Sequence, residues 1–474
     1  MKLLLKFSII IIALIGVVAC IEDGFSDSPS DQPIFSVDTL NLGTVFTDEP
    51  TPTSRFVVHN RHPKSLLISD ISLSGANADC FRLNVDGMSG KNFSAVEIRS
   101  NDSIFILVEA TLPVADGISA DYEASLDFIT NGVKRSVAIV AHGQNVERLH
   151  SVIIDKDTHF SAEKPYQIYD SLVVAKGATL TLDAGTTLCF HDKSMLIVRG
   201  KLISNGTPEN PVNMSGDRTG NVVGDISFDI MSRQWIGVFF TLTSKGNVLK
   251  NTIIRNTSQA LTIEGTPYED YSKTPQLYML NCRLRNSGDL VLEAYHSNIR
   301  AIGCEFAEAS TGLVYLQGGS HNFNHCTFAN YYLFTVISGP AIQFAHISDD
   351  AETGLDDTSG YPYLEASFSN CIIYGLGNDV SHGDLTGTNV FFNRCLLKGE
   401  GENDDNFIDC LFDEDPLYYT VRDDYYFDYR LKPESPAIGA ANPSLTLPDA
   451  ATDGYGLARG ETPDLGAYVF NSQE

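Results

Sequence analysis

The chain has 474 residues, and 32 Lys and Arg against 60 Asp and Glu give a formal net charge of −28. This length suggests two or three domains, and a composition of 43% apolar and 19% charged residues excludes a wholly disordered chain. Because phosphate backbones select clusters of Lys and Arg, this acidic chain is expected to bind no nucleic acid. Its 38 Gly, 26 Phe and 20 Tyr, without long amphipathic helical stretches, predict an all-β protein.

Residues 1–19 are typical of a signal peptide. Lys2 and Lys6 bracket the start of an apolar run, residues 7–18, that is short for a membrane span. The run ends in Val17-Val18-Ala19-Cys20, which resembles the lipobox of bacterial lipoproteins. In that family the thiol receives a diacylglyceryl group. The resemblance therefore implies lipidation of Cys20 and a membrane anchor of two or three acyl chains.

Residues 20–33 are rich in Ser, Asp and Pro and predict a flexible tether. The acidic residues directly after Cys20 resemble the surface-export signal of Bacteroidetes lipoproteins. That resemblance implies a protein anchored in the outer membrane and facing outward. The alternative is that these residues are simply a solvated linker.

Residues 34–145 predict a β-sandwich. Short alternating runs such as Ile104-Phe105-Ile106-Leu107-Val108 are separated by turn clusters such as Thr130-Asn131-Gly132. The succession of Leu42-Gly43-Thr44-Val45 and Phe56-Val57-Val58-His59-Asn60 resembles the immunoglobulin-like modules of bacterial surface proteins. Such modules usually act as spacers or docking surfaces.

Residues 150–412 predict a solenoid. The strand–glycine–strand rhythm from Leu172 to Ile203 resembles the opening coils of right-handed parallel β-helices. Six cysteines then recur, with gaps of 22, 22, 45, 24 and 15 residues, and each has an apolar residue two positions after it and three positions before it. Repeats near 22 residues must stack to bury their apolar strands, so these cysteines predict an internal ladder. Its members are Cys282, Cys304, Cys326, Cys371, Cys395 and Cys410.

Two segments without cysteine fit the same template, Leu249-Thr252-Ile254 and Ile342-Ala345-Ile347, and the second is expected to fill the 45-residue gap. Stacked side chains on neighbouring parallel strands suit disulfide geometry poorly, so the ladder is expected to be mostly reduced. Residues 264–275 and 348–363 break the period and are expected to form loops on one face, often a binding face.

Residues 413–474 leave the repeat. Arg430-Leu431-Lys432-Pro433-Glu434-Ser435-Pro436-Ala437-Ile438-Gly439, followed by Asp453, Arg459 and Asp464, resembles a terminal module of secreted β-helix proteins called a choice-of-anchor Q domain. We expect this module to cap the end of the solenoid, because an exposed edge strand needs protection. Taken whole, the mature chain resembles Bacteroidetes surface lipoproteins with an immunoglobulin-like front and a β-helix behind it.

An acidic ridge is the strongest candidate site in the solenoid. Aligned on the coils, Asp349, Asp350, Asp379 and Asp404 fall at one edge, where they could bind Ca²⁺ or a glycan. Pectin-lyase-like β-helices include polysaccharide-cleaving enzymes, which need an acid and a base placed about the scissile bond. The alternative is that an acidic protein simply places acidic residues in its loops, and we assign no catalytic residue and no required cofactor.

Two further groups have weaker claims. The tyrosines Tyr418, Tyr419, Tyr425, Tyr426 and Tyr429 could stack on sugars or pack the terminal module. Trp235, the only Trp, is expected in the core, and His321 and His325 lack a third metal ligand. The predicted function is non-catalytic binding of a glycan or a surface protein by an outer-membrane lipoprotein. A polysaccharide lyase or glycoside hydrolase, and a structural subunit of an envelope assembly, are the alternatives.

Overall fold

The computed structural model describes residues 24–223, 226–265, 274–345, 364–381, 385–386 and 388–472. The chain divides into two compact units, Met1–Asn145 and Val146–Glu474. The predicted signal peptide, Cys20, Asp349 and Asp350 lie outside the described residues.

The first unit contains two five-stranded sheets around one apolar cluster. In β8 (Ser103–Ala110), alternate residues Ile104, Ile106 and Val108 are buried, as the sequence pattern predicts for a strand with one face on a core. All described pairings between its strands are antiparallel except that of β10 with β2. The relation to immunoglobulin-like modules stays a prediction. In spatial order the sheets are β1 (Ile34–Phe35), β3 (Ser54–His59), β8, β5 (Phe81–Val85) and β6 (Met88–Gly90), and then β2 (Thr39–Phe46), β10 (Val133–Gln144), β9 (Ser119–Thr130), β4 (Leu66–Ser74) and β7 (Asn92–Ile98); the 3-10 turn η1 (Ala78–Cys80) precedes β5.

The second half of the predicted tether packs on this unit instead of hanging free. The backbone N–H of Ser26 donates to the carbonyl of Ser65 (2.9 Å), and the Asn131 amide donates to the carbonyls of Ser28 and Asp31. Ser26 itself is buried. Polar side chains here satisfy backbone groups locally, so the segment is ordered although it is rich in Ser, Asp and Pro.

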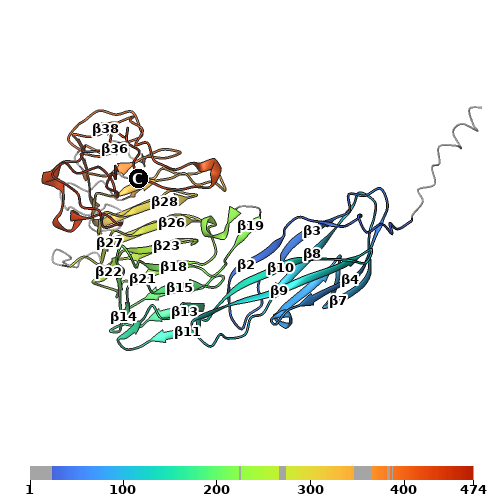
Figure 1. The fold of residues 1–474 in the computed structure, drawn as a ribbon. Coiled ribbons are helices and arrows are strands. Elements are labelled where there is room, and N and C mark those ends of the chain that lie inside the picture. Colours follow the sequence, from blue (N-terminus) through green and yellow to red (C-terminus); the bar gives the residue numbers. More distant parts are fainter. Residues whose placement is uncertain are drawn as a thin grey trace, which may run out of the picture. The chain divides into compact units, whose positions relative to one another are not determined.

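The second unit is a parallel coil of strands. Among the described residues, 26 strands form one sheet in which every pairing is parallel, and each strand pairs with a strand of the next coil. The large parallel solenoid that the repeats predict is therefore present, and Figure 1 shows its coils following one another from β11 to β38.

The pairings define three stacks. The first stack contains β11 (Glu147–Ile154), β13 (Tyr166–Val174), β16 (Met195–Val198), β21 (Gly237–Phe240), β24 (Leu261–Glu264), β27 (Leu292–Ile302), β29 (Val314–Asn324), β31 (Ile342–Ala345) and β34 (Val380–Ser381). The second contains β12 (Thr158–Phe160), β14 (Thr179–Leu182), β17 (Lys201–Asn205), β22 (Asn247–Lys250), β25 (Leu277–Leu280), the second halves of β27 and β29, β32 (Glu365–Ser369), β35 (Asn389–Asn393) and β37 (Phe407–Ile408). The third contains the start of β13, β15 (Thr187–Phe190), β18 (Val212–Gly216), β23 (Thr252–Arg255), β26 (Arg283–Ser287), β28 (Glu305–Ala309), β30 (Thr327–Ala329), β33 (Ile372–Ile373), β36 (Leu396–Leu397) and β38 (Leu411–Phe412). A short hairpin, β19 (Asn221–Val223) and β20 (Ile226–Ser227), and the 3-10 turn η2 (Phe228–Ile230) lie outside the stacks.

The predicted cysteine register agrees with the strand pairing. The residues two positions after the cysteines pair in series, beginning with Leu284 on Phe306 and Phe306 on Phe328. The residues three positions before them do the same, and the rings of Phe323 and Phe368 lie parallel with centroids 4.8 Å apart. That distance is the spacing of neighbouring strands. The Leu249-Thr252-Ile254 segment also fits, because Leu249 pairs with Met279 and Ile254 with Leu284.

The prediction that Ile342-Ala345-Ile347 forms a separate coil was wrong. Ile342 pairs with Val314 and Val380 in the first stack, whereas Phe323 pairs directly with Phe368 in the second. The backbone N–H of Cys326 donates to the sulfur of Cys371 (3.4 Å), so these cysteines belong to adjacent coils. The 45-residue gap is therefore one coil with an insertion after its first strand. The short strand that begins at Ile342 belongs to the first stack, and its apolar pattern happens to match that of the cysteine segments.

The prediction that residues 413–474 cap the end was also wrong. From Tyr418 to Tyr468 this segment packs on the outward side of the third stack, around Ala307, Ala329, Ile372 and Leu396. Gly466 allows the closest approach, because a Cβ there would lie 2.6 Å from Thr327 Oγ1 and 2.8 Å from Ile372 Cδ1. Outward-facing apolar residues are unfavourable in contact with water, and the C-terminal segment buries them by packing on this flank. We call residues 413–474 the flanking module. It contains the 3-10 turns η3 (Arg422–Asp424), η4 (Pro443–Leu445) and η5 (Pro448–Ala451). In Figure 1 it is coloured orange to red and lies beside β28.

Part of the end of the solenoid is covered by Asn403, which directly precedes Asp404 of the predicted acidic ridge. The Asn403 side chain accepts from the backbone N–H of Cys410 (2.7 Å) and donates to its carbonyl (3.2 Å). Its amide thus takes the place that the backbone of a further coil would occupy. This capping satisfies edge groups at the last cysteine.

Candidate functional site

The structure brings together the two described members of the acidic ridge. Asp379 and Asp404 line one depression of about 350 Å³, together with Glu400, Glu402 and the ring of Phe407. This places them as the alignment predicts, at one edge of the last coils.

The carboxylates of this ridge are engaged by the backbone. Asp379 accepts from the N–H groups of Val380 (2.7 Å) and Gly399 (2.9 Å), and Asp404 accepts from those of Asn406 (2.8 Å) and Phe407 (2.7 Å). Such bonds fix turns, as Asp side chains commonly do. Among the described residues, no group of three or more His, Cys, Asp or Glu is placed to hold a metal ion. The geometry of this part of the ridge favours a structural role.

The cysteine ladder lies in the interior of the solenoid. All six cysteines are buried and unpaired by disulfides. Five of the thiols donate to a carbonyl of the preceding coil, as Cys371 does to Phe323 (3.6 Å) and Cys395 to Phe368 (3.4 Å). Burial raises the pKa of the Cys326 thiol well above its ordinary value. Buried thiols of this kind pack as small apolar residues and are poor nucleophiles.

The tyrosine cluster divides into two groups. Tyr418 and Tyr429 are buried and pack the flanking module against the solenoid. Tyr425 and Tyr426 are exposed. Tyr419 is half-buried and faces a second depression. Packing of the terminal module therefore accounts for Tyr418 and Tyr429, and stacking on sugars stays a prediction.

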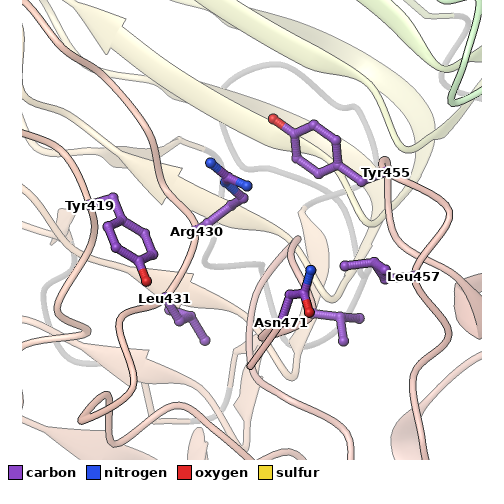
Figure 2. Close-up of a pocket in the computed structure, with 7 residues that line it drawn as sticks. Tyr419, Arg430, Leu431, Tyr455, Leu457 and Asn471 are labelled. Carbon is purple, nitrogen blue, oxygen red and sulfur yellow. The ribbon is translucent and has the colours of Figure 1, made fainter. Parts of the chain in front are cut away.

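This second depression, which we call the tyrosine depression, has a volume of about 250 Å³. Figure 2 shows the tyrosines Tyr419 and Tyr455 on opposite sides, with the Arg430 side chain between them. The remaining lining is mostly aliphatic and consists of Leu431, Leu457, Val469 and Asn471. The wall therefore combines apolar surface with a cation, two hydroxyls and an amide.

A buried carboxylate positions one side of the tyrosine depression. Asp453 is fully buried and accepts from the backbone N–H groups of Tyr455 (2.9 Å), Leu457 (2.9 Å) and Val469 (3.0 Å). One side chain thus fixes three of the lining residues. The sequence drew attention to Asp453 through the terminal-module motif, without indicating that it would organise a depression.

The opposite side is fixed by an ion pair. Asp428 Oδ2 lies 2.7 Å from Arg430 Nη2, and Asp428 also accepts from the Arg430 backbone N–H (3.0 Å). Arg430 is thereby held with its guanidinium carbon 5.6 Å from the centre of the Tyr455 ring, and the Arg283 guanidinium carbon lies 5.4 Å from the same ring. These distances are within the range of cation–π attraction.

A buried charged cluster joins the flanking module to the third stack. Arg285 donates to both oxygens of Glu305, and the hydroxyl groups of Tyr468 and Tyr429 donate to Glu305 and Glu308. Glu305 and Glu308 are nearly fully buried. Burial raises the pKa of Glu308 well above its ordinary value, although Arg285 opposes the shift. The sequence analysis did not predict this cluster. The available signal was that outward-facing positions of the third stack become apolar in the coils next to Glu305 and Glu308.

The remaining candidates are structural. Trp235 is 1% exposed and stacks on Phe190 with centroids 3.9 Å apart, which confirms the expectation that it lies in the core. His321 and His325 are both buried, and His325 contacts the carbonyl of Asp464 (3.1 Å) and the hydroxyl of Thr446 (2.9 Å) in the flanking module. Burial and the nearby Arg459 lower the pKa of His325 to about 2, so it is neutral at physiological pH.

Comparisons with known proteins leave the family of this chain open. No family model and no curated protein matches the sequence. Among solved structures, a family 123 glycoside hydrolase from Clostridium perfringens, described in work on glycolipid glycan hydrolysis, is 10% identical with a TM-score of 0.18, and the match covers 23% of this chain and 26% of that chain. The PapD-like domain 7 of human CEP192 is 14% identical with a TM-score of 0.17, covering 27% of this chain and 94% of that chain. Neither similarity is strong enough to assign a fold or a function.

The described residues contain no helix that is long and apolar enough to cross a membrane.

Proposed function

We propose that this protein is an outer-membrane lipoprotein, displayed outward, that binds a glycan without cleaving it. The tyrosine depression carries the proposal, because two tyrosine rings, three aliphatic side chains and a few polar groups converge there. Binding sites typically combine mostly apolar walls with a small number of placed polar groups. A sugar unit has the matching character, with C–H faces for rings and aliphatic side chains and hydroxyls for the polar groups.

The size of the depression suits a short ligand segment. Its volume of about 250 Å³ lies just below the range of about 300–1,000 Å³ that is usual for small-molecule sites. We therefore propose that it takes one or two sugar units of a longer chain. Because Asp453 and Asp428 hold the walls through hydrogen bonds within the module, little ordering is needed on binding.

The absence of cleavage is proposed from the state of the acidic ridge. Glycoside hydrolysis needs one carboxyl group as proton donor and a second as base or nucleophile. Asp404 accepts two backbone N–H bonds from its own turn, and Asp379 accepts one from Val380 and one from Gly399 of a later coil. Carboxylates that are held in this way serve the fold of the last coils.

Binding to an array of neutral and acidic glycans tests the proposal. We expect Tyr455→Ala and Tyr419→Ala to reduce binding of any retained glycan by tenfold or more, about the effect of one lost aromatic contact. Tyr425→Ala is the matched control, since Tyr425 is exposed in the same module outside the depression. Equal losses in all three variants, or no glycan bound, would contradict the assignment.

A cleavage assay separates binding from catalysis. The wild-type protein, Asp379→Ala and Asp404→Ala would be incubated with each retained polysaccharide, and new reducing or unsaturated ends would be measured. We expect none from any of them. Ends that form with the wild type and disappear in both variants would instead establish the lyase or hydrolase alternative.

The anchor has its own test. Cells that express the wild type or Cys20→Ala would be labelled with a palmitate analogue and treated externally with protease. We expect label and surface digestion for the wild type and no label for the variant. Labelled protein that resists protease in intact cells would place it on the inner side.

A further inference from the structure

The tyrosine depression bears cations on a strongly acidic protein. The chain carries 60 acidic and 32 basic residues, yet the charged side chain in the wall is Arg430, and Arg283 and Lys432 contact the two tyrosine rings of the wall. Lys432 Nζ lies 6.0 Å from the centre of the Tyr419 ring. One cation therefore lines the site of about 250 Å³, and two more lie against its tyrosine rings.

The nearby carboxylates offset the charge of Arg430 but leave that of Arg283 and Lys432. Asp428 pairs with Arg430, with 2.7 Å between Oδ2 and Nη2. Asp453 lies behind the wall and is fully buried, and its charge acts on the buried guanidinium of Arg459. Neither Arg283 nor Lys432 forms a salt bridge with any residue of the described ranges; Arg283 donates to the Tyr455 hydroxyl (3.3 Å) instead.

We infer that the ligand of this depression is an acidic sugar, with a carboxylate that lies between Arg283, Arg430 and Lys432. The inference rests on the proposed glycan binding and adds the charge of the ligand. A carboxylate is favoured because charge-assisted hydrogen bonds from guanidinium groups are about twice as strong as neutral ones. The negative field of the rest of the protein would repel an acidic glycan from other surfaces and leave this depression as its site.

Matched ligands that differ in charge test the inference. Titration calorimetry would compare trigalacturonic acid with its methyl ester, and 3′-sialyllactose with its methyl ester. We expect at least one acid to bind about tenfold more tightly than its neutral counterpart. The difference should shrink as salt is raised, since the cations are partly exposed to solvent.

Variants locate the effect. Arg283→Gln and Lys432→Gln should each reduce the preference for the acid about threefold to tenfold, measured as the ratio between the dissociation constants of the acid and of its neutral counterpart. Lys176→Gln is the control, because Lys176 is an exposed lysine of the solenoid outside the depression. Circular dichroism would confirm that each variant is folded.

The outcomes separate this inference from the proposal beneath it. Neutral and acidic glycans that bind equally, and lose affinity in Tyr455→Ala, would overturn the acidic ligand and leave glycan binding intact. An acid preference that survives both cation variants would also overturn it. Failure of every sugar to bind would overturn both.

Discussion

The inner and outer faces of the third strand stack follow different rules. Inward positions are large and apolar along the whole solenoid: Leu188, Met214, Ile254, Leu284, Phe306, Phe328, Ile373, Leu397 and Phe412. Outward positions one residue earlier change along the axis: Thr187, Asn213, Ile253, Arg283, Glu305, Thr327, Ile372, Leu396 and Leu411. The inward residues form the core of the solenoid, whereas the outward residues determine where the flanking module packs.

The change on the outer face occurs where the flanking module begins. Arg283 contacts Tyr455 and lies at the border, next to the buried ion pair of Arg285 and Glu305. Beyond it, Ile372 and Leu396 belong to the apolar cluster that the module completes. Substitutions on the inward face should therefore destabilise the solenoid, and substitutions on the outward face should detach the flanking module.

The largest effect is expected on the inner face. Phe328 is fully buried, and its ring stacks on Phe306 with centroids 5.0 Å apart. Phe328→Ala removes these contacts and leaves a cavity, so the free energy of unfolding of the second unit should fall by about 4 kcal/mol. Fluorescence of Trp235, the only Trp, reports this unit selectively during unfolding in urea.

Phe105→Ala is the control for that measurement. Phe105 is 47% exposed and belongs to the first unit, so the Trp235 transition should not move. A similar shift in both variants would show that the fluorescence does not isolate the solenoid.

The next effect concerns the charged cluster between the outer face and the module. Glu305→Ala leaves the Arg285 guanidinium without the carboxylate that neutralises it, which should cost about 3 kcal/mol. Asp289→Ala breaks an ion pair with Arg233 in which both side chains are about half exposed, and it should cost less than about 1 kcal/mol. Urea unfolding compares the two, and equal losses would mean that burial does not set the value of these pairs.

The cluster also predicts a pH dependence. Burial holds the pKa of Glu308 well above its ordinary value of 4.5, and the groups that face it are Arg285, Glu305 and Tyr429. A raised folded pKa means that its stabilisation is complete below about pH 4.5 and is lost as pH rises toward the folded value. The slope is at most about 1.4 kcal/mol per pH unit.

Glu308→Gln should flatten this dependence, because the amide cannot ionise. Unfolding midpoints measured from pH 5 to pH 9 would fall with pH in the wild type and change less in the variant. Tyr468→Phe, which removes a hydroxyl that faces Glu305, is the control and should retain the slope. Parallel profiles for the wild type and Glu308→Gln would rule out Glu308 as the source.

The sequence predicted the inner face well because its pattern is repeated. Each coil offers a further sample of the same constraint, so the register of Phe306, Phe323 and Phe368 could be aligned without coordinates. Ile342 misled the alignment because apolar alternation is common to all three stacks, and nothing local distinguishes one stack from another.

The outer face and the candidate site were harder to predict. Contacts such as Tyr429 with Glu308 join residues 121 positions apart without any repeat. Asp379 and Asp404 were placed correctly at one edge, but their backbone partners depend on turn geometry. The tyrosine depression depends on hydrogen bonds to Asp453 and Asp428, which fix its two sides within an irregular segment. No repeated sequence pattern accompanies such an arrangement, so it could not be predicted by alignment of the coils.

The smallest predicted effect separates the two faces at adjacent residues. Ile372 faces the flanking module and Ile373 faces the interior of the solenoid, and both are almost completely buried. Replacing either with Val removes one methylene and should cost about 1 kcal/mol. Ile373→Val should lower the Trp235 transition, while Ile372→Val should leave it in place and speed proteolytic release of the module after Lys432. Because the two substitutions are chemically identical, a common response would mean that solenoid and module unfold as one cooperative body.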